Sequence, residues 1–119
     1  MALSNFLSNR SCIQWIRYPF LDNHPDVSIA RRQMKAGGGL ISFEITGGLP
    51  AARRFVDSLR LIRIATSMGG TDSTIEIPFE LMRVRDENNE SKGLIRLSVG
   101  IEDVLLLKND IEQALASTL

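Results

Sequence analysis

The sequence predicts an α+β domain in which helices pack on one face of a small, mostly antiparallel sheet. Two observations support this class. A few short segments have strand patterns, and three amphipathic helical segments each carry an apolar stripe that needs a surface to cover. A chain of 119 residues is long enough for one hydrophobic core and too short for two. We therefore expect residues 1–119 to form a single domain.

Four segments alternate apolar and polar residues or are rich in β-branched and aromatic residues, as strands are. They are 13-IQWIRYP-19, 40-LISFEI-45, 62-IRIAT-66 and the beginning of 94-LIRLSVGIED-103. In the last segment, alternation places Ile95 and Leu97 on one face and Arg96 on the other. Arg96 thus interrupts an otherwise apolar strand. It is either a surface residue whose head group reaches water or a clamp for an anion.

Four further segments have the apolar spacing of helices. They cover residues 2–9, 25–35, 51–62 and 104–115. The first has no capping residue before it and reads as the end of a longer helix. Gly37 is expected to cap the end of the second helix, and Glu102 and Asp103 are placed at the positive N-terminal end of the last one. Between Met82 and Lys92 the apolar period is lost, which predicts an exposed loop.

Composition and charge exclude several classes of function. Fourteen basic and fourteen acidic residues cancel, so no basic excess predicts binding to nucleic acid. The single cysteine, Cys12, can form neither an intrachain disulfide nor a cysteine-based metal site, and we expect a reduced thiol. The single histidine, His24, precedes Pro25 at a predicted helix start, where capping is favoured over catalysis. Neither a signal peptide nor a membrane span is predicted, so we expect a cytoplasmic protein.

The residues do not form a recognisable catalytic set. His24 and Cys12 have no evident partner, so no nucleophile, base and orienting acid can be combined. The segment 67-SMGGTDS-73 differs from the other turns, because two glycines allow close approach of the backbone while Ser67 and Asp72 supply short polar groups. A phosphate-binding loop and an ordinary turn are both compatible with this pattern.

Four segments together are specific enough to indicate a family. They are 31-RRQMKAGGGLISFEITGG-48, 52-ARRFVDSLRL-61, 67-SMGGTDS-73 and 94-LIRLSVGIED-103. Their succession resembles the C-terminal domain of the pyridoxal-phosphate-dependent enzymes of cysteine and methionine metabolism. That family includes cystathionine γ-synthase, the cystathionine lyases and the O-acylhomoserine sulfhydrylases. The resemblance implies the C-terminal, substrate-binding domain of a fold-type I enzyme of trans-sulfuration. It does not distinguish among the family members, or between elimination and replacement reactions.

The resemblance also implies roles for three residues. Arg96 corresponds to the arginine that holds the α-carboxylate of the amino-acid substrate, and a guanidinium can grip a carboxylate through two parallel hydrogen bonds. Ser67 matches the family's serine beside the substrate and the cofactor-bearing lysine. Asp72 lies where many members have a glutamate that lines the pocket for the distal part of the substrate. These three are the expected substrate-binding residues, and no catalytic, cofactor-binding or metal-binding residue is expected in this chain.

The cofactor implied by the resemblance is pyridoxal phosphate, which a larger preceding domain holds in this family. That domain is absent from the sequence, and Lys35, Lys92 and Lys108 are all expected to be solvated, so none is a candidate Schiff-base lysine. The resemblance implies part of a lyase or transferase that is inactive alone. Its expected partners are an amino-acid substrate, a cofactor-binding domain of the same enzyme or a partner chain, and further copies in a homo-oligomer. No nucleic acid or membrane is expected among them.

Departures from the family pattern leave a second hypothesis open. Ile77 stands where the family usually has a histidine, and Leu105 and Leu106 occupy positions that are usually acidic. The chain is therefore either a substrate-binding domain or a non-catalytic remnant that serves as a protein-interaction domain. In the second case the two leucines would form a contact surface.

Overall fold

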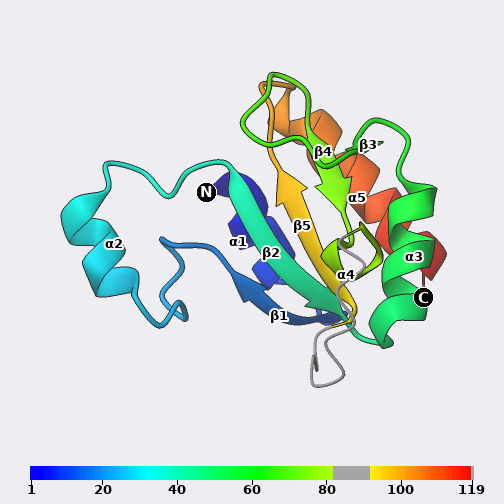
Figure 1. The fold of residues 1–119 in the computed structure, drawn as a ribbon, viewed down its shortest axis with the longest axis horizontal. Coiled ribbons are helices and arrows are strands. Elements are labelled where there is room, and N and C mark those ends of the chain that lie inside the picture. Colours follow the sequence, from blue (N-terminus) through cyan, green and yellow to red (C-terminus); the bar gives the residue numbers. More distant parts are fainter. Residues whose placement is uncertain (82–91, 119) are drawn as a thin grey trace.

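The computed structural model describes residues 1–81 and 92–118, and within these ranges it contains five strands and five helices. The strands are β1 (Ile13–Arg17), β2 (Leu40–Ile45), β3 (Arg63–Ile64), β4 (Thr74–Glu76) and β5 (Leu94–Ser98). The helices are α1 (Ala2–Ser8), α2 (Val27–Gln33), α3 (Gly48–Ser58), α4 (Pro78–Leu81) and α5 (Val104–Thr118). Figure 1 shows their arrangement.

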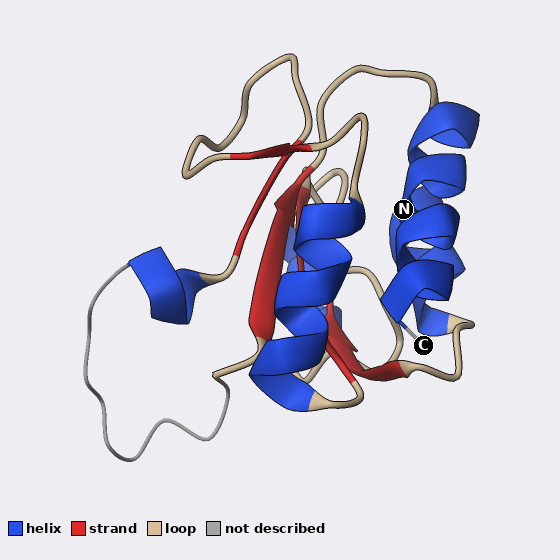
Figure 2. Ribbon diagram, turned by 90° about the vertical axis from the view of Figure 1, so that its right-hand side faces the viewer, coloured by secondary structure: helices blue, strands red, loops and turns tan. Residues whose placement is uncertain are grey.

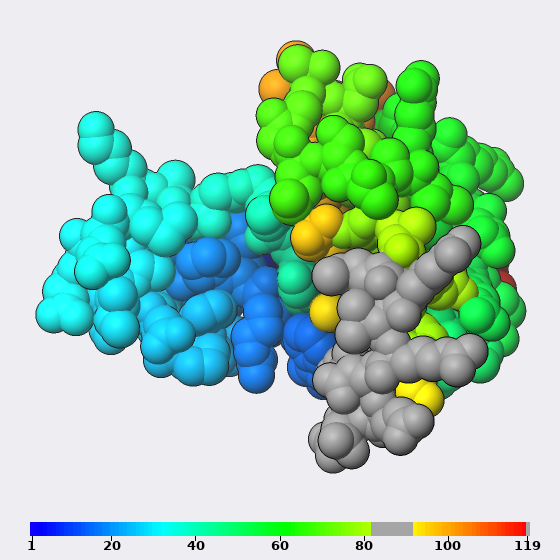
Figure 3. All heavy atoms as spheres, in the orientation of Figure 1, coloured from blue at the N-terminus to red at the C-terminus, as the bar shows by residue number. Residues whose placement is uncertain are grey.

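The strands form one sheet in the order β1-β2-β5-β4-β3, in which only β3 and β4 are parallel neighbours among the described strands. Helix α5 packs against α3 and α1, helix α3 also packs against β2 and β5, and helix α1 packs against β1 (Figure 2). The predicted α+β class, with a mostly antiparallel sheet, is therefore confirmed. Helix α2 instead protrudes from the rest of the molecule (Figures 1 and 3). No helix within the described ranges is long and apolar enough to cross a membrane.

The hydrophobic core lies between the sheet and helices α3 and α5. Ile95 and Leu97 of β5 are fully buried, as the alternation of that strand predicted. Phe43 of β2 meets Phe55 of α3 edge to face, with ring centroids 5.9 Å apart. This arrangement brings the positive edge of one ring to the negative face of the other, which stabilises the contact beyond simple burial. The apolar side of β5 is thus held in the core, and its other side is left for polar residues.

Two elements were missed in the sequence, and several others had different limits. The segment 74-TIEI-77 alternates and buries Ile75 and Ile77, but β4 is only three residues long and was not predicted. The one-turn helix α4 was also missed. Strand β3 covers two residues instead of five, and α3 begins at Gly48, before the predicted start. The loop predicted between Met82 and Lys92 lies almost entirely outside the described residues.

The ends of the helices correct two predictions and confirm a third. Gly37 does not cap α2, which ends in an extended Met34; Gly37 lies under Tyr18, where a Cβ atom would come within 2.6 Å of the ring. His24 does not cap α2 either: its Nδ1 accepts a hydrogen bond at 3.0 Å from the N–H of Asp26, the residue before the helix, and no side chain caps the first turn of α2. At the start of α5, Oδ1 of Asp103 accepts from the N–H groups of residues 105 and 106, as predicted.

Two details of the last helix were predicted wrongly. Val104 does not continue the buried stripe but is 42% exposed. Glu102 does not interact with the helix, because its carboxylate turns to Ser73 instead. Glu102 precedes α5 and Val104 is its first residue, so both differences arise where the chain turns from β5 into the helix.

A buried carboxylate connects α5 to the segment between α3 and β3. Asp110 accepts hydrogen bonds from the backbone N–H groups of Arg60, Leu61 and Ile62 at 2.8, 2.9 and 3.0 Å. Burial acts to raise the pKa of Asp110, but these hydrogen bonds outweigh it, and the pKa lies below its ordinary value. The charged form of Asp110 therefore stabilises the folded chain.

We expect Asp110→Ala to lower the free energy of unfolding by about 1–3 kcal/mol, because three backbone donors lose their acceptor. The folded-state pKa is depressed, so this contribution is complete above the unfolded-state pKa near ~3.9 and is lost as the pH falls through the folded-state value. Urea unfolding at several pH values measures the difference between wild type and variant, which should shrink on the acid side. Asp57→Asn, which removes the charge of an exposed aspartate, is the control. An unfolding curve for Asp110→Ala that overlays the control at pH 7 would contradict the assignment.

Candidate functional site

Arg96 projects from the central strand of the sheet, on the side opposite the core. Its register partners are Ser42 on β2 and Glu76 on β4. The neighbouring Ile95 and Leu97 are buried on the other side, so the alternation predicted from the sequence is present. The side chain of Arg96 is 31% exposed. It is therefore partly sheltered by its neighbours and still accessible from solvent.

The guanidinium of Arg96 forms an ion pair with Glu76 through Nη2 and Oε1. The side chain of Glu76 is only 6% exposed, so its charge is almost entirely removed from water. Among the residues that the structure describes, Glu76 is the one carboxylate within ion-pair distance of Arg96. Sequence reasoning did not assign Glu76 to the site. The alternation of 74-TIEI-77 was the pattern that could have placed Glu76 on the same face as Arg96.

The turn of residues 67–73 is fastened to the same face of the sheet. The N–H of Gly69 donates to Oγ of Ser98 at 3.1 Å, and Oγ1 of Thr74 donates to the carbonyl of Ser67 at 2.6 Å. Ser98 lies two residues after Arg96 on β5, so the two side chains share a face and are separated by roughly 7 Å along the strand. The structure thus brings the turn that contains Ser67 and Asp72 beside Arg96.

The far end of this turn is held by the partly buried carboxylate of Glu102. The N–H and Oγ of Ser73 donate to Glu102 at 2.9 and 3.0 Å, and the N–H of Gly100 donates to Oγ of Ser73 at 2.8 Å. Burial acts to raise the pKa of Glu102, but the hydrogen bonds from Ser73 outweigh it and the pKa lies below its ordinary value. Gly100 packs so closely on the carbonyl of Thr71 that a Cβ atom would clash with backbone. These contacts fix the turn rigidly to β5.

Ser67 and Asp72 are both exposed and line one shallow hollow of about 320 Å³. Arg63 and Thr74 contribute to its wall, whereas Arg96 does not. Two of the three predicted residues therefore share a hollow, and Arg96 lies outside it on the same side of the sheet.

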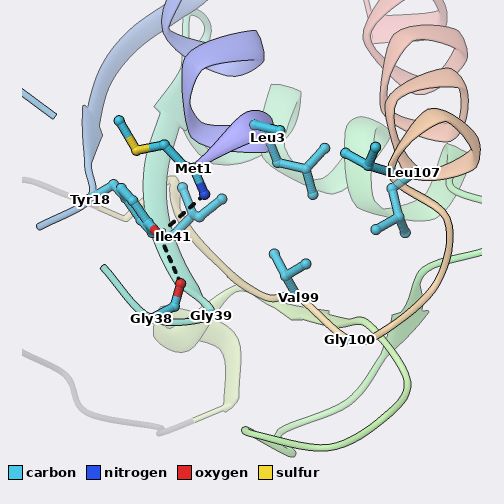
Figure 4. A pocket seen from close by; sticks show the side chains of 11 residues that line it. Met1, Leu3, Tyr18, Gly38, Gly39, Ile41, Val99, Gly100 and Leu107 are labelled. Atoms are coloured by element: carbon cyan, nitrogen blue, oxygen red, sulfur yellow. Dashed lines mark hydrogen bonds between the residues drawn. The ribbon is translucent and has the colours of Figure 1, made fainter. Parts of the chain in front are cut away.

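A second hollow, of about 310 Å³, lies beneath the start of α1 and contains none of the three residues (Figure 4). Its polar part is a short chain of hydrogen bonds. The terminal ammonium of Met1 donates to Oη of Tyr18 at 3.2 Å, and Oη of Tyr18 donates to the carbonyl of Gly38 at 2.9 Å. The remaining wall is mostly aliphatic, including Leu3, Val99 and Leu107, so this hollow offers little to an ionic ligand.

The three lysines lie apart from the hollow that contains Ser67 and Asp72. Lys35 and Lys92 are exposed, and Nζ of Lys92 lies 5.6 Å from the centroid of the Phe79 ring. Lys108 is half-buried rather than fully solvated as predicted, with Nζ 5.8 Å from the centroid of the Phe6 ring. None of the three lysines lines the hollow that contains Ser67 and Asp72. The groups on this face can hold an anion and make short polar contacts.

The chain belongs to the family of Cys/Met metabolism PLP-dependent enzymes, whose sequence profile matches residues 1–116. PLP is pyridoxal phosphate, the cofactor that the sequence resemblance implied. The predicted family is therefore confirmed.

The chain is 38% identical over 120 residues to the L-methionine gamma-lyase of Pseudomonas deceptionensis, an alignment that covers 96% of the chain and 30% of that enzyme. It is 40% identical to the cystathionine beta-lyase of Lactococcus lactis subsp. cremoris, with 95% and 31% covered. The crystal structure of metB from Corynebacterium glutamicum superposes with a TM-score of 0.90 at 38% identity, with 97% and 31% covered. The chain thus spans about 30% of the length of the curated relatives it matches.

We expect Arg96→Ala to destabilise the chain by about 1–3 kcal/mol, because it leaves the buried carboxylate of Glu76 without its partner. Arg96→Ala combined with Glu76→Gln should recover part of this loss, since the remaining group is neutral. Chemical denaturation of wild type, the single variant and the double variant measures both effects. Arg53→Ala breaks the exposed pair with Glu80 and is the control, with a change of about 0.5 kcal/mol or less. If Arg96→Ala lowers the free energy of unfolding no more than the control does, the buried carboxylate of Glu76 does not need Arg96 as its partner.

Proposed function

We propose that this chain is the substrate-binding part of a pyridoxal-phosphate-dependent trans-sulfuration enzyme, and that Arg96 holds the α-carboxylate of an amino-acid substrate. The observation that carries the proposal is the position of Arg96. A partly exposed arginine projects from the middle of a rigid central strand, beside a turn fastened to the same face. The membership of the chain in this enzyme family supports the proposal.

The chemistry of the guanidinium suits a carboxylate. Arg96 presents planar N–H donors that match the two oxygens of a carboxylate. Partial burial reduces competition from water, which strengthens charge-assisted hydrogen bonds. Two parallel bonds would fix the direction of the substrate as well as its position. Orientation of this kind contributes to catalysis by reducing the entropy lost in reaching the transition state.

Ser67 and Asp72 are proposed to contact the rest of the substrate. Their shared hollow and Arg96 lie on the same side of the sheet, so a substrate held by its α-carboxylate could extend toward them. Asp72 would interact with polar or cationic groups on the distal part of the substrate, and Ser67 with groups nearer to the α-carbon. The hydrogen bonds of Ser73 with Glu102 keep both residues in place.

The cofactor chemistry is proposed to come from outside this chain. The family is pyridoxal-phosphate-dependent, but the lysines here do not form a cofactor site. The relatives are about three times as long as the matched region, so the part that the chain does not match is the natural source of the cofactor site. We therefore propose a cofactor-binding domain, in the same enzyme or in a partner chain, as the essential partner. Assembly into a homo-oligomer is part of the same proposal.

The carboxylate clamp can be tested in a chimera in which this chain replaces the matching 30% of the Pseudomonas deceptionensis enzyme. All forms carry Glu76→Gln, so that no buried charge is left unpaired. Adding Arg96→Ala should weaken the binding of L-methionine by roughly 2–5 kcal/mol, the range for loss of one partner of a buried charge pair. Arg96→Lys should restore only part of this affinity, because an ammonium group cannot form two parallel hydrogen bonds with a carboxylate.

Titration of the cofactor absorbance with L-methionine gives the affinity of each chimera. The control is Arg53→Ala, which removes an exposed arginine on α3. Unchanged affinity for L-methionine in the Arg96→Ala form would rule out the clamp. If Arg96→Lys instead has the full affinity of the arginine form, the residue contributes only its positive charge and not two parallel hydrogen bonds.

The isolated chain provides a second test. Incubation with pyridoxal phosphate should leave only weak, unselective absorbance that gel filtration removes, because no lysine lies in the hollow beside Ser67 and Asp72. The chain should also convert none of the amino acids used by its relatives, because holding a carboxylate supplies orientation but no electron sink. A stoichiometric yellow complex that borohydride reduces onto one lysine would overturn the proposal that the cofactor site lies elsewhere.

A second candidate function is a non-catalytic interaction domain. The start of α5 exposes apolar side chains to solvent, with Ile101 at 82%, Leu105 at 61% and Leu106 at 56% exposed. Exposed apolar side chains that lie together are typical of contact surfaces. A chimera that assembles and binds the cofactor but no amino acid would favour this second function over the first.

A further inference from the structure

We infer that Glu76 is a positioning residue for Arg96: it tethers one edge of the guanidinium so that the other edge is presented to a carboxylate ligand. This inference rests on the proposed clamp and goes beyond it by assigning a role to a residue that contacts no substrate. It is carried by the register of two strands, the burial of Glu76 and the partial exposure of Arg96.

Strand register makes Glu76 and Arg96 direct neighbours. They are paired across β4 and β5, next to the pair of Ile75 with Leu97. Directly opposed residues of an antiparallel pair have Cβ atoms roughly 4.5–5.5 Å apart, within reach of a carboxylate and a guanidinium. Both strands are central in the sheet, with neighbours on either side. The separation of the two side chains is therefore set by backbone hydrogen bonds and not by a mobile loop.

The burial of Glu76 makes the pairing obligatory. A carboxylate that is removed from water must be matched by a cation or by hydrogen-bond donors, because an unpaired buried charge is strongly unfavourable. Arg96 is the cation that the structure places against Glu76. Among the described residues, Arg96 is the cation within ion-pair distance of Glu76, so its release into solvent would take away that partner of the buried acid. The pairing therefore restrains the long side chain of the arginine. Restraint before binding reduces the conformational entropy that a ligand would otherwise have to remove.

The ion pair leaves room for a second carboxylate. A guanidinium has five N–H donors, and one carboxylate can engage two of them in parallel. The side chain of Arg96 is 31% exposed while that of Glu76 is 6% exposed, so the solvent-facing part of the pair belongs to the arginine. On its β2 side, Arg96 faces Ser42, which is a small residue. Glu76 is therefore placed to hold the arginine from within the sheet while a ligand approaches from solvent.

The test compares Glu76→Gln with Glu76→Leu in the isolated chain by NMR. Both substitutions remove the charge, but only glutamine keeps an oxygen that can accept from the guanidinium. The Nε–Hε signal of Arg96, assigned by its loss in Arg96→Lys, should show restricted motion in wild type and Glu76→Gln and free motion in Glu76→Leu. The affinity for L-methionine, followed by the shift of this signal, should be about threefold to tenfold higher in the glutamine variant than in the leucine variant.

Glu80→Gln is the matched control, because it removes a carboxylate from the exposed pair with Arg53 and should change neither measurement. Equal order and equal affinity in the glutamine and leucine variants would overturn the inference. Higher affinity in the leucine variant would also overturn it and make Glu76 a competitor of the ligand. Glu76→Met replaces the leucine variant if that variant does not fold. L-methionine could leave the Arg96 signal of wild type unchanged while the motion of the Arg96 side chain still depends on residue 76. That result would support the positioning role of Glu76 and contradict the proposed carboxylate clamp.

Discussion

The central position of β5 constrains both the core and the candidate site. This strand pairs with β2 on one side and β4 on the other, so its backbone cannot shift without breaking two sets of hydrogen bonds. Because side chains alternate along a strand, the burial of Ile95 and Leu97 in the core forces Arg96 and Ser98 onto the opposite face. The burial of Ile95 and Leu97 therefore determines the face of the sheet from which Arg96 projects.

Side-chain carboxylates connect segments that strand pairing does not reach. The buried Asp110 accepts from three consecutive backbone N–H groups between α3 and β3, and the partly buried Glu102 accepts from Ser73 at the end of the polar turn. Each acid compensates for its own loss of hydration by satisfying donors that would otherwise be unpaired. Such connections hold the irregular segments against the helices and the sheet.

The pair of Arg96 and Glu76 couples stability to the proposed function. An arginine on a solvated helix face, such as Arg53, can be removed with little effect because its partner remains hydrated. Arg96 differs because its partner is buried. A substitution that removes substrate binding would also weaken the fold, so loss of activity alone would not distinguish the two effects. Neutralisation of Glu76 separates them, since it removes the charge that Arg96 has to match.

The sequence by itself determined the fold class, the two faces of β5 and the apolar stripes of α3 and α5. Helical and strand periodicities follow from local backbone geometry, which a short segment already contains. The family could also be identified, because several polar and glycine-rich segments occur in a specific order. The sequence did not identify the partner of Arg96, the role of Glu102 or the strand β4. Those features depend on which strands lie side by side and in which register, and residues distant in the chain decide that only when the core packs.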